Sequence, residues 1–129
     1  MAMICIKTFV NSWCTSDRMG ERNRLPCIFG CEDCEDKLSH YLRCNPLWLV
    51  ACSALRLDDS YASIDFPRRL GFPVPSSTSL ILLCVMFKTY HALRRDFASM
   101  ITLSVADEDF SDLIHRAFFL ANHFAADWI

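Results

Sequence analysis

Apolar residues recur at intervals of three and four along several segments of the chain, which is typical of helices with one buried face. In residues 3–13 this spacing predicts a short amphipathic helix. Its apolar stripe consists of Ile6, Phe9, Val10 and Trp13. Residues 47–55 are almost wholly apolar and follow Pro46, which suits the first turn of a helix, so we expect a buried helix there.

The two longest helical patterns lie in the last part of the chain. Residues 79–101 repeat an apolar side over many turns, and Ser77 or Thr78 is placed to cap that helix. A final helix is expected from about Asp107, because acidic residues cluster there and complement the positive end of a helix dipole. We expect these two helices to pair antiparallel. The continuously apolar run at 80–87 is too short for the roughly 20 residues of a membrane span, so no membrane partner is expected.

Four cysteines and one histidine fall within residues 27–44, and they have metal-ligand spacing. They are Cys27, Cys31, Cys34, His40 and Cys44. A structural zinc ion requires four thiolate or imidazole donors in a tetrahedron, and two pairs that are each close in sequence supply them at little cost in loop entropy. We therefore predict one zinc finger of Cys-Cys-His-Cys type, held by Cys27, Cys31, His40 and Cys44.

Cys34 leaves the choice of ligands open. It lies three residues after Cys31, so it could replace Cys27 or Cys31 as a donor. We favour Cys27, because it directly follows the turn residue Pro26. Gly30 allows a sharp turn just before Cys31, which would let backbone amides approach the thiolates.

The second pair of ligands is expected on a short helix. Asp36 precedes an amphipathic stretch and is placed to cap or favour the start of that helix. His40 and Cys44 are four residues apart, so on a helix they would lie on one face and point at the same ion.

Length and composition suit a single folded domain, or a small zinc module with a helical extension. The chain has 129 residues, of which 53% are hydrophobic, and this excludes intrinsic disorder. Eight cysteines would also suit a disulfide framework in a secreted protein, but the first ten residues do not resemble a signal peptide. We therefore expect reduced cysteines in an intracellular compartment, nuclear or cytoplasmic.

Together these patterns predict a mainly α-helical protein in which the small zinc finger is embedded among helices. The amino-terminal helix, the finger and the following helix occupy residues 1–57. Residues 58–78 contain three prolines and a glycine and are expected to form a linker. Residues 79–129 are expected to form a helical tail.

Four stretches of the sequence point to a relationship that periodicity does not supply. They read FVNSWCTSDRM, LPCIFGCEDCEDKLSHYLRCNPLW, RRLGFPVPSS and KTYHALRR. They resemble the carboxy-terminal region of LINE-type (non-LTR) retrotransposon polyproteins, in which a Cys-Cys-His-Cys segment follows the reverse transcriptase domain and a helical tail follows that segment. The resemblance implies a Zn²⁺-binding accessory segment of a reverse transcriptase. Its implied partners are RNA or single-stranded DNA and the polymerase domain of the parent polyprotein.

No catalytic motif accompanies this resemblance. A reverse transcriptase needs paired aspartates on a strand hairpin to hold two metal ions, usually preceded by an aromatic residue and one other. Asp58 and Asp59 instead follow Arg56 and Leu57, so we interpret them as a solvated pair in the linker. We expect no enzymatic activity.

The charge balance limits nucleic-acid binding, because affinity for phosphate normally depends on clustered Lys and Arg and this chain has a formal net charge of −2. A local patch beside the finger is still expected, with arginines for phosphates and aromatic rings on which single-stranded bases stack. The candidate residues are Arg18, Arg22, Arg24, Phe29, Tyr41 and Arg43. The alternative is that the aromatic rings, with Trp48, pack the finger onto the neighbouring helices.

A second class of function stays open at this point. In it zinc is only a structural staple and the helices form a protein-interaction surface. A non-functional truncated retroelement fragment is a further alternative, because no polymerase domain follows Met1. A basic, aromatic-lined face beside the finger would favour nucleic-acid binding, whereas an exposed apolar stripe along residues 80–101 would favour protein interaction.

Overall fold

A computed structural model of the chain describes residues 2–9, 13–15, 17–22, 25–74, 76–101 and 110–129. Its helices are α1 (Ala2–Phe9), α2 (Leu38–Tyr41), α3 (Asn45–Ala54), α4 (Asp59–Ala62), α5 (Phe66–Arg69), α6 (Ser77–Ile101) and α7 (Phe110–Ala125), followed by a 3-10 turn, η1 (Ala126–Trp128). The described residues are mainly helical and contain no β-strand, which confirms the predicted fold class.

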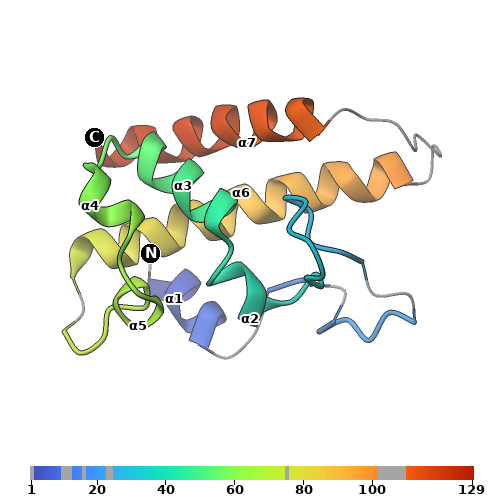
Figure 1. The fold of residues 1–129 in the computed structure, drawn as a ribbon, viewed down its shortest axis with the longest axis horizontal. Coiled ribbons are helices and arrows are strands. Elements are labelled where there is room, and N and C mark those ends of the chain that lie inside the picture. Colours follow the sequence, from blue (N-terminus) through green and yellow to red (C-terminus); the bar gives the residue numbers. More distant parts are fainter. Residues whose placement is uncertain (1, 10–12, 16, 23–24, 75, 102–109) are drawn as a thin grey trace.

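Helices α6 and α7 are the longest elements, and they run side by side in opposite directions (Figure 1). The predicted pairing of two carboxy-terminal helices is therefore confirmed. Helix α3 packs against both of them, and α1 packs against α6. The predicted buried helix at 47–55 corresponds to α3, in which Leu47 and Trp48 are fully buried.

Helix α6 begins differently from the prediction. Ser76 caps α6, since its hydroxyl oxygen accepts a hydrogen bond of 3.1 Å from the Ser79 N–H. The predicted caps, Ser77 and Thr78, instead lie in the first turn, where the side chain no longer reaches the exposed N–H groups. Helix α7 is described from Phe110, so its predicted acidic start near Asp107 lies outside the described residues.

Helix α1 ends at Phe9 and is shorter than the predicted helix over 3–13. Trp13 lies beyond it in irregular backbone and is nevertheless fully buried. Its indole Nε1 donates a hydrogen bond of 2.9 Å to Thr8 Oγ1, and its ring stacks on that of Tyr90 with centroids 5.3 Å apart. The other predicted members of the stripe lie outside the part of the chain whose side chains are described: Ile6, Phe9 and Val10.

One hydrophobic core joins the two sides of the predicted linker. The segment 58–78 contains the short helices α4 and α5. Trp48 before this segment, and Leu82 and Ala117 after it, belong to the same cluster of buried residues. None of the helices in the described ranges is long and apolar enough to cross a lipid bilayer.

Trp13→Ala should lower the free energy of unfolding by about 3–5 kcal/mol, because it removes a fully buried indole and leaves a cavity. Chemical denaturation followed by circular dichroism measures this change. Trp128→Ala is the matched control, because Trp128 is 41% exposed, and it should cost less than about 1 kcal/mol. Equal losses in the two variants would contradict the placement of Trp13 in the core.

Candidate metal centre

The first two cysteines of the candidate site lie on a tight loop whose two ends pair. The Cys27 N–H donates to the Cys34 carbonyl at 2.8 Å, and the Asp36 N–H donates to the Leu25 carbonyl, also at 2.8 Å. Between these bonds the chain reverses direction, and Gly30 adopts a φ of 76°, which favours glycine. This loop, residues 25–36, is called the knuckle below.

His40 and Cys44 come from two different elements. His40 lies in α2, which ends at Tyr41. Cys44 occupies the N-cap position of α3, with extended backbone. The expectation that one helix carries both ligands is therefore wrong, because the chain turns after Tyr41 and Pro46 starts a new helix. The N-cap position places the Cys44 sulfur at the positive end of the α3 dipole, which favours a thiolate.

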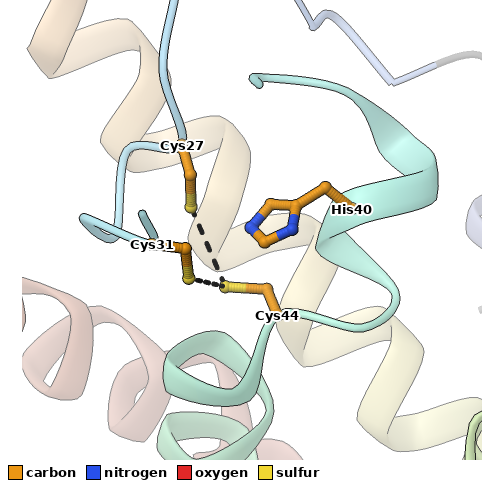
Figure 2. Close-up of side chains that lie close together, drawn as sticks. All are labelled: Cys27, Cys31, His40 and Cys44. Carbon is orange, nitrogen blue, oxygen red and sulfur yellow. Dashed lines mark hydrogen bonds between the residues drawn. The ribbon is translucent and has the colours of Figure 1, made fainter. Parts of the chain in front are cut away.

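The four predicted ligands converge on one point (Figure 2). Their donor atoms all lie within 4.8 Å of one another, and the residues are Cys27, Cys31, His40 and Cys44. The Cys44 Sγ lies 4.0 Å from the Cys27 Sγ and 3.7 Å from the Cys31 Sγ. Cys34 is half-buried and lies outside this group, although its carbonyl fixes the Cys27 backbone.

These distances fit a tetrahedral metal site. With metal–sulfur bonds of about 2.3 Å, the sulfur atoms at two corners of a tetrahedron are about 3.8 Å apart. A disulfide requires about 2.05 Å, and these cysteines are free. His40 Nε2 is buried and has no hydrogen-bond partner among the described residues, as expected of a nitrogen reserved for a metal. The His40 ring turns one nitrogen toward the sulfur atoms in Figure 2.

The three thiols do not ionise independently when no cation is present. The Cys27 and Cys44 sulfur atoms share a hydrogen bond, and this bond lowers the pKa of Cys27 despite its burial. The same bond raises the pKa of Cys44, and burial raises the pKa of Cys31. A divalent cation would displace the protons that these thiols retain.

A buried carboxylate, that of Asp36, connects the knuckle to helix α6. Asp36 is fully buried, and its Oδ1 accepts hydrogen bonds from the Tyr41 hydroxyl at 2.6 Å and the Tyr90 hydroxyl at 2.8 Å. Its Oδ2 lies 3.5 Å from Arg94 Nε. The Tyr41 hydroxyl also accepts from the Ile28 N–H at 3.3 Å, next to the ligand Cys27. This network ties the metal-binding loop to α6.

The predicted capping role of Asp36 is therefore wrong. Lys37 occupies the N-cap position of α2 and makes no side-chain capping bond. The Asp36 side chain turns away from the helix end because two tyrosine hydroxyls in the core donate to it. Burial, reinforced by Asp36, raises the pKa of both Tyr41 and Tyr90, which keeps the hydroxyls protonated as donors.

The residues predicted to contact nucleic acid have three different outcomes in the structure. Arg18, Arg22 and Arg43 are exposed, and the Arg43 guanidinium carbon lies 4.3 Å from the centre of the Phe66 ring. Arg24 lies outside the described residues. Phe29 and Tyr41 were predicted as stacking platforms, and this is wrong, because they are only 1% and 0% exposed. Both rings pack in the core, which is the alternative that the sequence left open.

A basic hollow between α6 and α7 was missed by the sequence-based reasoning. It encloses about 270 Å³ and is lined by Phe87, Lys88, His91, Ala92, Arg95 and Phe124. No carboxylate is among these residues. Lys88 Nζ lies 5.7 Å from the centre of the Phe124 ring. The helical spacing of Lys88, His91 and Arg95 was visible in the sequence, but nothing in it indicated that Phe124 would lie opposite.

Comparisons with protein-family models, with curated proteins and with solved structures found no match to this chain.

Tyr90→Phe should lower the free energy of unfolding by about 1–3 kcal/mol, because it removes one of the two hydroxyls that donate to the buried Asp36 carboxylate. Thermal and chemical denaturation of the metal-saturated protein measure the loss. Tyr61→Phe is the control and should be nearly neutral, because the hydroxyls that donate to Asp36 belong to Tyr41 and Tyr90. A Tyr90→Phe protein as stable as the wild type would show that the network contributes little.

Proposed function

We propose that the chain binds one Zn²⁺ through Cys27, Cys31, His40 and Cys44, and that this ion is structural. The observation that carries the proposal is the convergence of three sulfurs and one unpartnered imidazole nitrogen within 4.8 Å. A donor set of three thiolates and one imidazole in a tetrahedron is typical of zinc. Four protein ligands leave no open position for a substrate, which is why a structural role is favoured over a catalytic one.

We further propose that the zinc module is an accessory, non-catalytic segment of a retrotransposon reverse transcriptase, acting on RNA or single-stranded DNA in a reducing intracellular compartment. The resemblance of residues 27–48 to that region of LINE-type polyproteins supports this role. The exposed arginines beside the knuckle and the basic hollow between α6 and α7 support contact with phosphates and bases. The polymerase domain of the parent polyprotein is the corresponding protein partner.

Asp58 and Asp59 support the non-catalytic part of this proposal. Asp58 caps α4, where its Oδ1 accepts a hydrogen bond of 2.9 Å from the Ser60 N–H. The Ser60 hydroxyl and this bond lower the pKa of the exposed Asp58 carboxylate. Asp58 therefore has a local structural role, and Asp59 lies in the first turn of α4, where a negative charge complements the helix dipole.

The competing role as a protein-interaction module receives less support from α6. Residues 82–86 of this helix are buried, and residues 80–95 include no exposed large apolar side chain. One observation, in the loop before α6, does favour the role in protein interaction. Phe72 and Val74, in the loop before α6, are 54% and 78% exposed. A pull-down that depends on these two residues, together with an absence of nucleic-acid binding, would favour it.

Native mass spectrometry should find one zinc ion in the wild-type protein. His40→Ala should lose the ion or bind it much more weakly, because it removes one of four donors. Cys34→Ser is the matched control and should keep one zinc ion, since Cys34 lies outside the cluster. A folded wild-type protein without metal, or loss of zinc on Cys34→Ser, would contradict the assigned site.

Fluorescence anisotropy with labelled single-stranded RNA and DNA, between about 50 and 200 mM salt, tests the nucleic-acid role. Lys88→Gln with Arg95→Gln should weaken binding and reduce the slope of log K against log salt by about 0.7 for each phosphate that the variant no longer neutralises. Arg18→Gln, Arg22→Gln and Arg43→Gln test the arginines beside the knuckle in the same way.

Arg68→Gln serves as the control for this titration. Arg68 is an exposed arginine that belongs to neither tested group and already pairs with Asp65, so its substitution should leave binding nearly unchanged. Absence of binding by the zinc-loaded wild type at about 50 mM salt would sink the nucleic-acid proposal and leave the zinc site standing.

A further inference from the structure

Arg69 is a buried arginine in the segment that the sequence predicted to be a linker. It ends α5 and is only 8% exposed. Its guanidinium lies over the Trp48 ring, 4.7 Å from the ring centre. Nη2 donates to the Asn45 Oδ1 at 3.1 Å, and Nε donates to the Ile64 carbonyl at 3.3 Å. Arg69 thus packs against the first turns of α3, whose N-cap is the ligand Cys44.

The charge of Arg69 has no carboxylate partner in the described part of the chain. Both of its acceptors are neutral oxygen atoms, and Nη1 is buried without any hydrogen-bond partner among the described residues. Burying an arginine without a counter-charge is costly, and burial accordingly lowers the pKa of its guanidinium. A residue of this kind requires an anion close by.

Two thiols, one on α3 and one at its N-cap, are the candidates for this anion. Arg69 Nη2 hydrogen-bonds Asn45, which directly follows the ligand Cys44, and Cys52 lies farther along the same helix. Cys52 is not a suitable permanent anion, because burial raises the pKa of its thiol to about 11. Cys44 becomes a thiolate when a metal ion binds. A zinc ion with three thiolates and a neutral imidazole carries a net charge of minus one.

We propose that Arg69 is the counter-charge of the zinc centre, and that it positions the Cys44 end of α3 through Asn45. This inference rests on the proposed zinc site. It explains why a positive charge is buried in a segment that otherwise has the composition of a linker. It also gives the buried guanidinium, whose Nη1 has no hydrogen-bond partner among the described residues, a charge of opposite sign. Glu32, Asp33 and Glu35 in the knuckle are acidic and cannot serve. Lys37 and Arg43 line a hollow with His40, but Lys37 pairs with Glu35 and Arg43 is exposed to solvent, so neither supplies a buried positive charge.

The role as counter-charge predicts opposite effects on the metal-free and metal-bound protein. Arg69→Met retains most of the side-chain volume and removes the charge. It should raise the Kd for Zn²⁺ by about tenfold or more, in the range seen when a group that supports a metal ligand is removed. The metal-free protein should be at least as stable as the wild type, because an uncompensated buried charge is gone. A residue needed only for packing would instead destabilise both forms.

The experiment measures zinc affinity by competition with a chromophoric chelator, and the stability of the chelator-treated protein by denaturation. Arg68→Met is the matched control, since Arg68 precedes Arg69 on α5 and is 70% exposed, and its zinc affinity should stay within twofold of wild type. Arg69→Lys keeps the charge and should lose less affinity than Arg69→Met. This second variant decides the question if Arg69→Met does not fold.

Each outcome separates this inference from the zinc proposal. A wild-type protein that binds no zinc would refute the proposed site itself. A wild type that binds zinc, with equal affinity in Arg69→Met, would refute only the role of Arg69. Equal losses of affinity in Arg69→Lys and Arg69→Met would show that the geometry of the guanidinium matters and its charge does not, which also overturns the inference.

Discussion

Three thiols that lie within 4.8 Å of one another and of a neutral imidazole cannot all ionise unless a cation lies among them. This constraint concerns three separate parts of the chain that meet at the candidate site. The knuckle is closed by its own backbone bonds, α2 contributes one nitrogen, and the N-cap of α3 contributes the last sulfur. Each piece is too short to be stable alone, since α2 has only four residues. A divalent ion bound to all three pieces would supply the stability that their short secondary structure does not provide.

The metal centre is continuous with the helical core. Asp36 joins the knuckle to α6 through Tyr90, and Tyr41 connects Asp36 to the backbone beside Cys27. Trp13 stacks on Tyr90 and Tyr41, so the amino-terminal segment meets the same place. The residues beside the candidate metal ligands therefore contact residues that lie far away in the sequence. The knuckle and α2 therefore belong to the same domain as the long helices.

Features that depend on residues close in sequence, such as ligand spacing and helix periodicity, were predicted correctly. Features that depend on contacts between distant residues, such as the role of a buried side chain, were not. Ligand spacing is local, so Cys27, Cys31, His40 and Cys44 were named correctly as the group that converges. Apolar periodicity likewise located α3, α6 and α7. Asp36 was misread because its partner Tyr90 lies 54 residues away.

The burial of Phe29 and Tyr41 also follows from packing against distant helices. A ring in a short loop has the same sequence signature whether it stacks on a base or fills a core. Arg69 was placed in a linker for the same reason, because neither Asn45 nor Trp48 is close to it in sequence.

The most direct test of the central claim is X-ray absorption at the zinc K-edge on the purified, zinc-loaded protein. We expect a first shell of three sulfur atoms at about 2.3 Å and one imidazole nitrogen at about 2.0–2.1 Å. A shell of four sulfur atoms would mean that Cys34 has displaced His40, and a shell of oxygen atoms would mean that the ion lies elsewhere. Either result would contradict the assignment of Cys27, Cys31, His40 and Cys44 as the site on which this fold depends.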